Sequence, residues 1–163
     1  MRWEPVSSTP DQEVYHLYKD DKKILSLTLH PFSQSARVET ESEKRVFQIR
    51  KEGFLRNKTV LRSEYGIKIG ELGHENGQHF IDINEERYFY AIKDNPLAEL
   101  LIYKEQKELP LITCGLSTEK GSPEILFKKG HTLANTSQPG LLMALCWYMF
   151  LPVTRETLVD LAQ

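Results

Sequence analysis

Basic side chains gather between Lys44 and Lys68, where Glu52 and Glu64 are the only acidic residues. Arg56, Lys58 and Arg62 share one parity, opposite Leu55 and Leu61. In an extended strand these three would point the same way. Such a stripe suits phosphates or anionic lipid headgroups, at about 1 kcal/mol per basic residue near a membrane surface. The alternative is a solvated outer face whose charges discourage edge pairing of strands.

A second basic group, Lys128-Lys129-Gly130-His131, superficially resembles a phosphate-binding loop. It lacks the Gly-x4-Gly-Lys-Ser/Thr pattern and does not open directly into a helix. We therefore interpret it as a basic turn, and we include Lys128 and Lys129 among the candidate lipid- or anion-binding residues.

His74 and His79 are the two histidines closest in sequence, and Asn76-Gly77 lies between them. Asn-Gly is a strong signal for a two-residue hairpin turn, which would bring the histidines opposite each other. Asp82 or Glu75 could then complete a metal site. The pattern supplies no closed ligand set, so we predict no metal and no cofactor.

Catalytic motifs are absent from the sequence. There is no Gly-x-Ser-x-Gly elbow, and Ser33, Ser35 and Ser117 have no evident base partner. Glu85-Glu86 falls on an expected turn, where solvation explains a carboxylate pair. An RNA-stacking surface would need exposed aromatic residues on a basic sheet, and the basic stretch offers only Phe47 and Phe54. We expect a protein that is not an enzyme and does not bind nucleic acid.

Composition indicates a single domain of 163 residues, with 40% hydrophobic and 27% charged residues and a net charge of -2. This charge gives no bulk attraction to nucleic acid. Cys114 and Cys146 are expected to be reduced, buried thiols. The N-terminus lacks the apolar segment of a signal peptide. We therefore expect a cytoplasmic protein, peripheral if it meets a membrane.

The elements that must position these residues include one apolar stretch, from Gly140 to Leu151. Its Leu, Met and Ala content predicts a helix over about 138–151 that is apolar on every face, as in a protein core. Its core residues are Leu142, Leu145, Cys146, Trp147, Met149 and Phe150. It is shorter than the roughly 20 residues that cross a bilayer, so a membrane anchor is the less favoured interpretation. After Pro152 we predict a short helix over about 154–162, or a continuation of the first helix beyond a kink.

The chain before this helix predicts strands. Short runs rich in β-branched and aromatic residues recur about every 8–12 residues, a spacing typical of sandwiches and barrels. The expected strands are 13–19, 23–29, 36–41, 44–51, 58–63, 66–72, 78–83, 87–92, 98–105, 110–116 and 124–127. A helix that is apolar all round needs a wall on every side. We therefore predict a mainly β fold, a closed or nearly closed antiparallel barrel of about 11–12 strands around the helix.

Many short strands followed by one apolar C-terminal helix resemble the tubby C-terminal-like superfamily, which includes LURP-one-related proteins and phospholipid scramblases. The resemblance rests on Leu141 to Leu151, on Val46-Phe47-Gln48-Ile49 and on Tyr65-Gly66-Ile67-Lys68-Ile69-Gly70. It implies a barrel around a central helix and a binding or scaffold role, with an anionic membrane surface or another protein as partner. The chain has no residue match to a tubby phosphoinositide site or to the calcium-binding segment of scramblases, so scrambling is not implied.

We therefore predict a non-enzymatic binding domain that recognises anionic lipid headgroups or a protein through its outer surface. The alternative is a small-molecule-binding barrel, a carrier or an enzyme, with a pocket at the barrel mouth. The volume left inside the barrel discriminates between these two functions.

Overall fold

The computed structural model describes residues 1–95, 97–105, 109–116, 123–126 and 139–161. The fold is mainly β, with one antiparallel sheet and one C-terminal helix. Its strands are β1 (Arg2–Ser8), β2 (Glu13–Lys19), β3 (Lys22–His30), β4 (Ser35–Thr40), β5 (Arg45–Glu52), β6 (Lys58–Ser63), β7 (Lys68–Glu75), β8 (Gln78–Ile83), β9 (Glu86–Asn95), β10 (Leu97–Tyr103), β11 (Ile112–Leu116) and β12 (Pro123–Leu126). A 3-10 turn, η1 (Phe54–Arg56), joins β5 to β6, and the helix is α1 (Pro139–Leu161).

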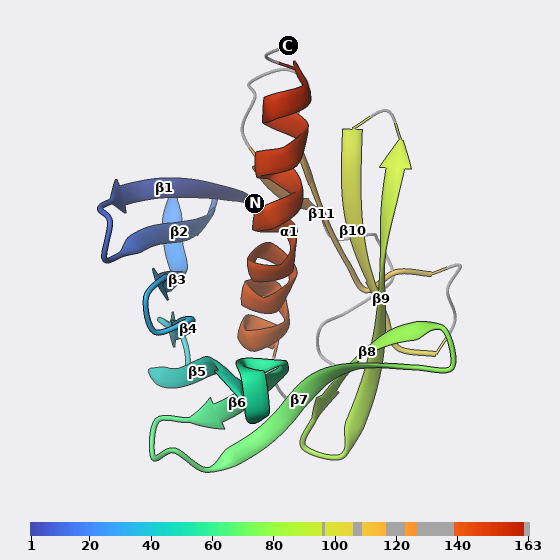
Figure 1. The fold of residues 1–163 in the computed structure, drawn as a ribbon. Helices are drawn as coiled ribbons and strands as arrows, with labels where there is room; N and C mark the ends of the chain where they lie inside the picture. Colours follow the sequence, from blue (N-terminus) through green and yellow to red (C-terminus); the bar gives the residue numbers. More distant parts are fainter. Residues whose placement is uncertain (96, 106–108, 117–122, 127–138, 162–163) are drawn as a thin grey trace.

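Each strand pairs with its neighbour in the chain, so the sheet is a continuous series of hairpins from β1 to β12. The sheet curves around α1, which runs through the middle of the molecule (Figure 1). β1 and β12 stand at the two ends of the series and share one register pair, Arg2 with Glu124.

Alternation along the strands explains how the sheet holds the helix. In β3, Leu25 and Leu27 are fully buried, and in β5 Phe47 and Ile49 are also buried. These side chains form one core together with α1, whose residues Leu141 to Trp147 are all buried. The predicted core residues are confirmed for Leu142, Leu145, Cys146, Trp147 and Phe150, while Met149 is only partly buried.

Trp147 shows how closely helix and sheet are packed. Its ring stacks on Trp3 of β1 at 5.6 Å between centroids and meets the edge of Tyr15 of β2 at 5.8 Å. Stacked and edge-on aromatic pairs of this kind add to the free energy gained by burial alone. The helix is therefore anchored to the first hairpin of the sheet.

The separate C-terminal helix predicted over 154–162 is wrong, and its alternative is confirmed: α1 continues through Pro152 to Leu161. Proline leaves the carbonyl four residues earlier, here that of Tyr148, without its amide partner. Tyr148 and Pro152 both line a cavity that is open to solvent, so water can satisfy that carbonyl. Among the described residues, no helix is long and apolar enough to cross a membrane.

The strand predictions hold in existence and order, with shifted ends. The strand expected over 66–72 is β7, Lys68–Glu75. The Asn76-Gly77 turn is confirmed, with positive φ at both residues and Glu75 paired to Gln78. β1 was not predicted, because Pro5 argues against a strand interior. It is accommodated where the register between β1 and β2 shifts, between Pro5 and Ser7.

Cys114 of β11 and Cys146 of α1 are buried free thiols, as predicted. Burial, together with the hydrogen bond to Cys146, raises the pKa of Cys114 well above its usual value. The thiol therefore stays protonated at neutral pH and acts as a core side chain.

Candidate functional site

The molecule has two unlike ends. We call one end the mouth: β3 and β5 end there, and β2, β4 and β6 begin there. Figure 1 shows the last turns of α1 extending beyond the sheet. A backbone hydrogen bond from Lys51 to Gln34, 3.2 Å long, ties the end of β5 to the β3–β4 turn at the mouth.

A cavity of about 860 Å³ opens at the mouth. Its walls come from β2 to β9, and its floor comes from Tyr148, Met149 and Leu151 of α1. The volume lies within the range of roughly 300–1,000 Å³ found for small-molecule sites. The helix thus fills the middle of the wrapped sheet but leaves space at this end.

The inward-facing side chains change from apolar to polar as the strands reach the mouth. In β5, Phe47 and Ile49 face the core, and Lys51 is the next residue on the same face. In β7, Leu72 packs against the core and His74 follows it on that face. In β8, Ile81 is buried and His79 is the corresponding mouth residue. Alternation therefore places a ring of polar groups at the entrance to an apolar interior.

Lys51 is the cationic residue in the described part of the cavity wall. It is half-buried, and its Nζ donates a hydrogen bond to Oγ1 of the buried Thr59, at 2.8 Å. Glu13, across the cavity, accepts a hydrogen bond from Tyr15. Among the described residues, no carboxylate forms an ion pair with Lys51. Its positive charge is thus turned into the cavity with only a hydroxyl beside it.

Two phenols complete the polar lining. Burial raises the pKa of Tyr90 and of Tyr148, so both stay protonated at neutral pH. Neutral phenols can donate hydrogen bonds to a ligand while their rings supply apolar contact area.

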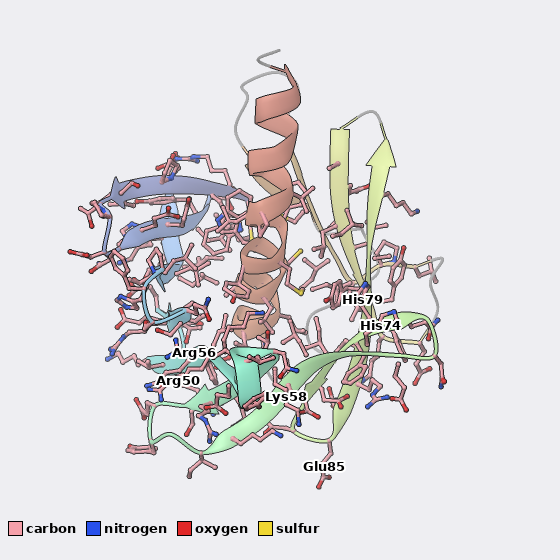
Figure 2. The ribbon with its side chains drawn as sticks, viewed as in Figure 1. Arg50, Arg56, Lys58, His74, His79 and Glu85 are labelled. Atoms are coloured by element: carbon pink, nitrogen blue, oxygen red, sulfur yellow. The ribbon has the colours of Figure 1, made fainter. Side chains whose placement is uncertain are left out.

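The histidine prediction is confirmed in its geometry. His74 and His79 are paired directly across the β7–β8 hairpin, 4.7 Å apart between ring centroids, and His79 stacks on Tyr90 (Figure 2). The carboxylates suggested as further metal ligands are placed elsewhere. Asp82 and Glu75 alternate to the outer face of the sheet, and both bind Arg87 there, at 2.7–2.9 Å. The described residues contain no cluster of three or more possible metal ligands.

Large apolar side chains project from the turns at the mouth. Phe54 and Leu55 in η1 are 87% and 82% exposed, and Phe32 in the neighbouring β3–β4 turn is 75% exposed. Leu55 and Arg56 both have positive φ, at 63° and 50°. Non-glycine residues adopt this conformation at an energetic cost, and such strain is concentrated at functional sites. We call Phe32, Phe54 and Leu55 the mouth tips.

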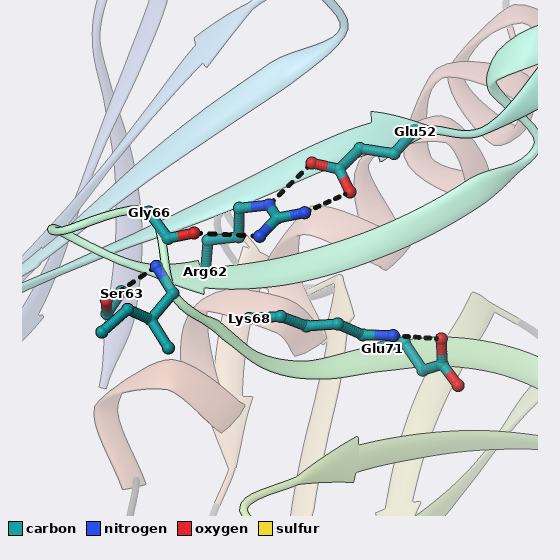
Figure 3. Close-up of polar contacts among 7 residues, drawn as sticks. Glu52, Arg62, Ser63, Gly66, Lys68 and Glu71 are labelled. Atoms are coloured by element: carbon teal, nitrogen blue, oxygen red, sulfur yellow. Dashed lines mark hydrogen bonds and ion pairs between the residues drawn. The ribbon is translucent and has the colours of Figure 1, made fainter.

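The predicted stripe of Arg56, Lys58 and Arg62 is not a single row. Arg56 lies in η1 and Lys58 at the start of β6, and Figure 2 labels both beside Arg50. β6 pairs with β5 without a shift from Lys58 to Ser63, so Lys58 and Arg62 keep their common parity, whereas Arg56 lies in the turn outside the strand. The guanidinium of Arg62 binds both carboxylate oxygens of Glu52 at 2.7 and 2.8 Å (Figure 3). Leu55, expected on the opposite face, is also in the turn and is 82% exposed. Lys128 and Lys129 lie outside the described residues.

The basic residues differ in whether their charge is paired within the protein. The hydrogen bond to Glu52 raises the pKa of Arg62, and the reciprocal bond lowers the pKa of Glu52. Arg62 is therefore neutralised within the protein. Arg50, Arg56 and Lys58 form no ion pair with any described residue, and Arg56 and Lys58 stand directly beside the mouth tips.

The turns at the opposite end of the sheet carry mainly carboxylates. The described acidic residues of these turns are Asp20, Asp21, Glu41, Glu43, Glu64, Glu85 and Glu105. Among the described turns at the mouth, Asp11 is the one acidic residue. The described turns thus give the sheet one strongly acidic end and one end with apolar tips beside basic residues.

Sequence reasoning missed Lys51, Phe32 and Leu55 as functional candidates. For Lys51 a signal was present, since it shares its parity with Phe47 and Ile49 in a predicted strand. For Phe32 and Leu55 the signal was a bulky apolar residue inside a turn between two strands. Neither signal shows which turns lie at the same end of the sheet.

Comparison with protein-family models, with curated proteins and with solved structures finds no match to this chain. The resemblance to the tubby C-terminal-like superfamily therefore stays a prediction, and the function must be argued from the site.

Proposed function

We propose that this protein is a non-enzymatic domain that binds an anionic lipid surface through its mouth. The observation that carries the proposal is that exposed apolar tips stand beside basic side chains that form no ion pair with the described residues. Phe54 and Leu55 immediately precede Arg56, and Lys58 follows two residues later. A membrane interface offers an apolar layer beneath anionic headgroups, and this arrangement of side chains complements both.

Charge along the molecule supports one orientation. The carboxylate-rich turns at the opposite end would be repelled by an anionic surface, whereas the mouth would be attracted. The whole chain is slightly acidic, so attraction depends on this separation of charges and not on net charge.

The closed barrel and the cellular location are part of the same proposal. We take the register pair between Arg2 and Glu124 as the closure of the sheet into a barrel of the tubby-like type. We also propose a cytoplasmic protein that is peripheral at the membrane, because free buried thiols such as Cys114 and Cys146 suit a reducing compartment.

Co-sedimentation with vesicles tests the proposal. The full chain is mixed with phosphatidylcholine vesicles that contain zero, 20 or 40% phosphatidylserine, at low and at physiological salt. We expect binding that rises with the anionic fraction. Phe54→Ser together with Leu55→Ser should weaken it roughly a hundredfold, because each side chain contributes about 1.5 kcal/mol when it leaves water.

A matched control comes from the opposite end. Tyr65 and Ile67 lie in the β6–β7 turn and are 83% and 65% exposed, so Tyr65→Ser together with Ile67→Ser removes similar apolar area. Binding should be unchanged in this variant. No binding to any vesicle at low salt, or equal losses in the two double variants, would contradict membrane docking by the mouth.

The second candidate function is the binding of a small molecule, and the mouth cavity favours it. A ligand that remains with the protein through purification and is identified by native mass spectrometry would support this candidate.

A further inference from the structure

We propose that the mouth cavity binds an amphiphile with one alkyl chain and an anionic head, with Lys51 facing the head. Fatty acids and lysophospholipid phosphates share this chemistry. The inference rests on the proposed function only for the route by which the ligand arrives. Binding itself follows from the cavity and is testable without any membrane.

Lys51 indicates that the head group of the ligand is anionic. Within the described part of the chain, the half-buried ammonium of Lys51 has a hydroxyl partner and no carboxylate, which is the compensation that a buried cation usually receives. Thr59, which accepts the hydrogen bond from Lys51, holds the ammonium within the cavity wall. An anionic head would supply the missing counter-charge through a charge-assisted hydrogen bond.

The apolar floor of the cavity indicates that the ligand carries an alkyl chain. Below the polar ring, the cavity is bounded by Leu29 and Leu72 of the sheet and by Met149 and Leu151 of α1. An inorganic anion or a small polar metabolite would leave these surfaces in contact with water. An alkyl chain would cover them, and burial of each CH₂ group favours binding.

The cavity opens next to the mouth tips that we propose to dock on the lipid surface. The cavity wall includes Pro31 and Gln34 of the turn that carries Phe32, and Asn57 beside η1. A protein seated by its mouth tips would therefore hold the cavity entrance against the lipid surface. A single-chain lipid that leaves the bilayer would enter with its head near Lys51.

Methionine methyl NMR provides the test in solution. The chain has three methionines, Met1, Met143 and Met149. Met149 lines the cavity, while Met143 is buried elsewhere in the core and serves as an internal control. The probes are laurate, lauroyl lysophosphatidate, dodecanol and inorganic phosphate, with the lipids below their micelle concentrations.

We expect laurate or lauroyl lysophosphatidate to shift the Met149 signal while Met143 stays fixed, and the stronger of the two identifies the head group. Dodecanol should bind at least tenfold more weakly, and phosphate should not shift Met149. Lys51→Gln should lower affinity for the anionic lipid at least tenfold, whereas Lys51→Arg should retain it. Lys44→Gln, in the exposed β4–β5 turn at the opposite end, is the matched control and should leave affinity unchanged.

The inference is overturned if neither anionic lipid shifts Met149, if dodecanol binds equally well, or if Lys51→Gln binds like the unmodified chain. Circular dichroism of each variant guards against loss of fold. Failure of this inference is distinguishable from failure of membrane docking. Phe54→Ser with Leu55→Ser should weaken vesicle binding and leave laurate binding in solution intact.

Discussion

The two ends of the sheet differ in how their exposed side chains are compensated. At the opposite end, Asp21 pairs with Arg2, Glu41 pairs with Lys23, and the turn tips are mostly acidic. At the mouth, Arg56 and Lys58 have no ion-pair partner among the described residues, and the adjacent tips are apolar. Both ends carry exposed apolar residues, so exposure alone does not distinguish them.

We therefore expect the stability of the fold and the binding of a lipid surface to depend on different side chains. Core side chains such as Trp147, and ion-paired ones such as Glu52, have partners within the protein, so their removal should lower the free energy of unfolding. The mouth tips are exposed, and Arg56 and Lys58 have no ion-pair partner among the described residues, so removal of these side chains should change binding and leave folding nearly unchanged. Variants of these two groups of side chains test this separation.

The largest effect on stability is expected for Trp147→Ala. Trp147 is 2% exposed and packs against Trp3, Tyr15 and Phe150. Loss of a buried aromatic side chain should cost about 3–5 kcal/mol in the free energy of unfolding. Urea denaturation followed by circular dichroism measures it, and a loss below about 0.5 kcal/mol, typical of surface sites, would contradict this placement.

Trp147→Phe is the matched control for that measurement. The indole Nε1 of Trp147 is buried without a hydrogen-bond partner among the described residues. Phenylalanine removes this unsatisfied donor and keeps most of the aromatic volume. It should therefore cost clearly less than alanine.

Gly70→Ala should also act on stability, by close approach of two strands. A Cβ at position 70 would lie 1.9 Å from the carbonyl oxygen of Asp82, which is backbone and cannot turn aside. We expect a loss of about 3 kcal/mol, at the upper end of the usual cost of overpacking. Thermal denaturation provides the measurement.

Gly115→Ala is the control for that position, because its Cβ would meet no atom closer than 3.7 Å. It should change stability little. If Gly70→Ala were equally harmless, the packing of β7 against β8 would be looser than the structure indicates.

Much of the architecture could be predicted from residues because it depends on local patterns. The apolar run from Leu141 to Leu151 specifies a buried helix, and Asn76-Gly77 specifies a hairpin. β1 escaped prediction because Pro5 interrupts its pattern, although Trp3 has a partner in Trp147, distant in sequence. A residue whose partner lies so far along the chain carries no local sign of it.

The candidate site was less predictable, since it depends on which turns share an end of the sheet. Parity grouped Arg56, Lys58 and Arg62, yet Arg56 lies in the η1 turn and the ion pair with Glu52 neutralises Arg62. Conversely, Lys51 of β5 and His79 of β8 line one cavity only because the strand registers bring their inward-facing residues to the same end of the sheet. That arrangement follows from registers, which the sequence does not state.

Removal of two basic side chains at the mouth tests how far vesicle binding depends on their charge. Arg56→Gln together with Lys58→Gln should weaken binding to phosphatidylserine vesicles by about 2 kcal/mol at low salt. The difference should shrink as salt shortens the Debye length from about 10 Å at 0.1 M to about 3 Å at 1 M. Stability should be unchanged, because neither residue has an ion-pair partner among the described residues.

Arg62→Gln is the informative comparison for these two residues. Its guanidinium is already bound to Glu52 and to the carbonyl oxygen of Gly66, at 2.9 Å. Vesicle binding should fall less than in the Arg56 and Lys58 variant. Equal losses would show that the pairing with Glu52 does not decide which bases attract lipid.

The smallest effect is expected for the pH dependence of the Glu52–Arg62 pair. The hydrogen bonds from Arg62 hold the pKa of Glu52 below its ordinary value of 4.5. The folded state therefore takes up this proton less readily than the unfolded state does. The contribution of the pair to stability is present above pH 4.5 and is lost as the pH falls through the lower folded value.

Glu52→Gln should consequently lower stability slightly at neutral pH and converge with the unmodified protein in acid. Glu85→Gln is the control, since Glu85 points into solvent on the β8–β9 turn (Figure 2) and should change little at any pH. Urea midpoints between pH 3 and 7 measure both variants. Because Glu52→Gln also releases the charge of Arg62, it should strengthen binding to anionic vesicles even as it weakens the fold. A variant in which both quantities fell together would argue against the separation of stability from binding.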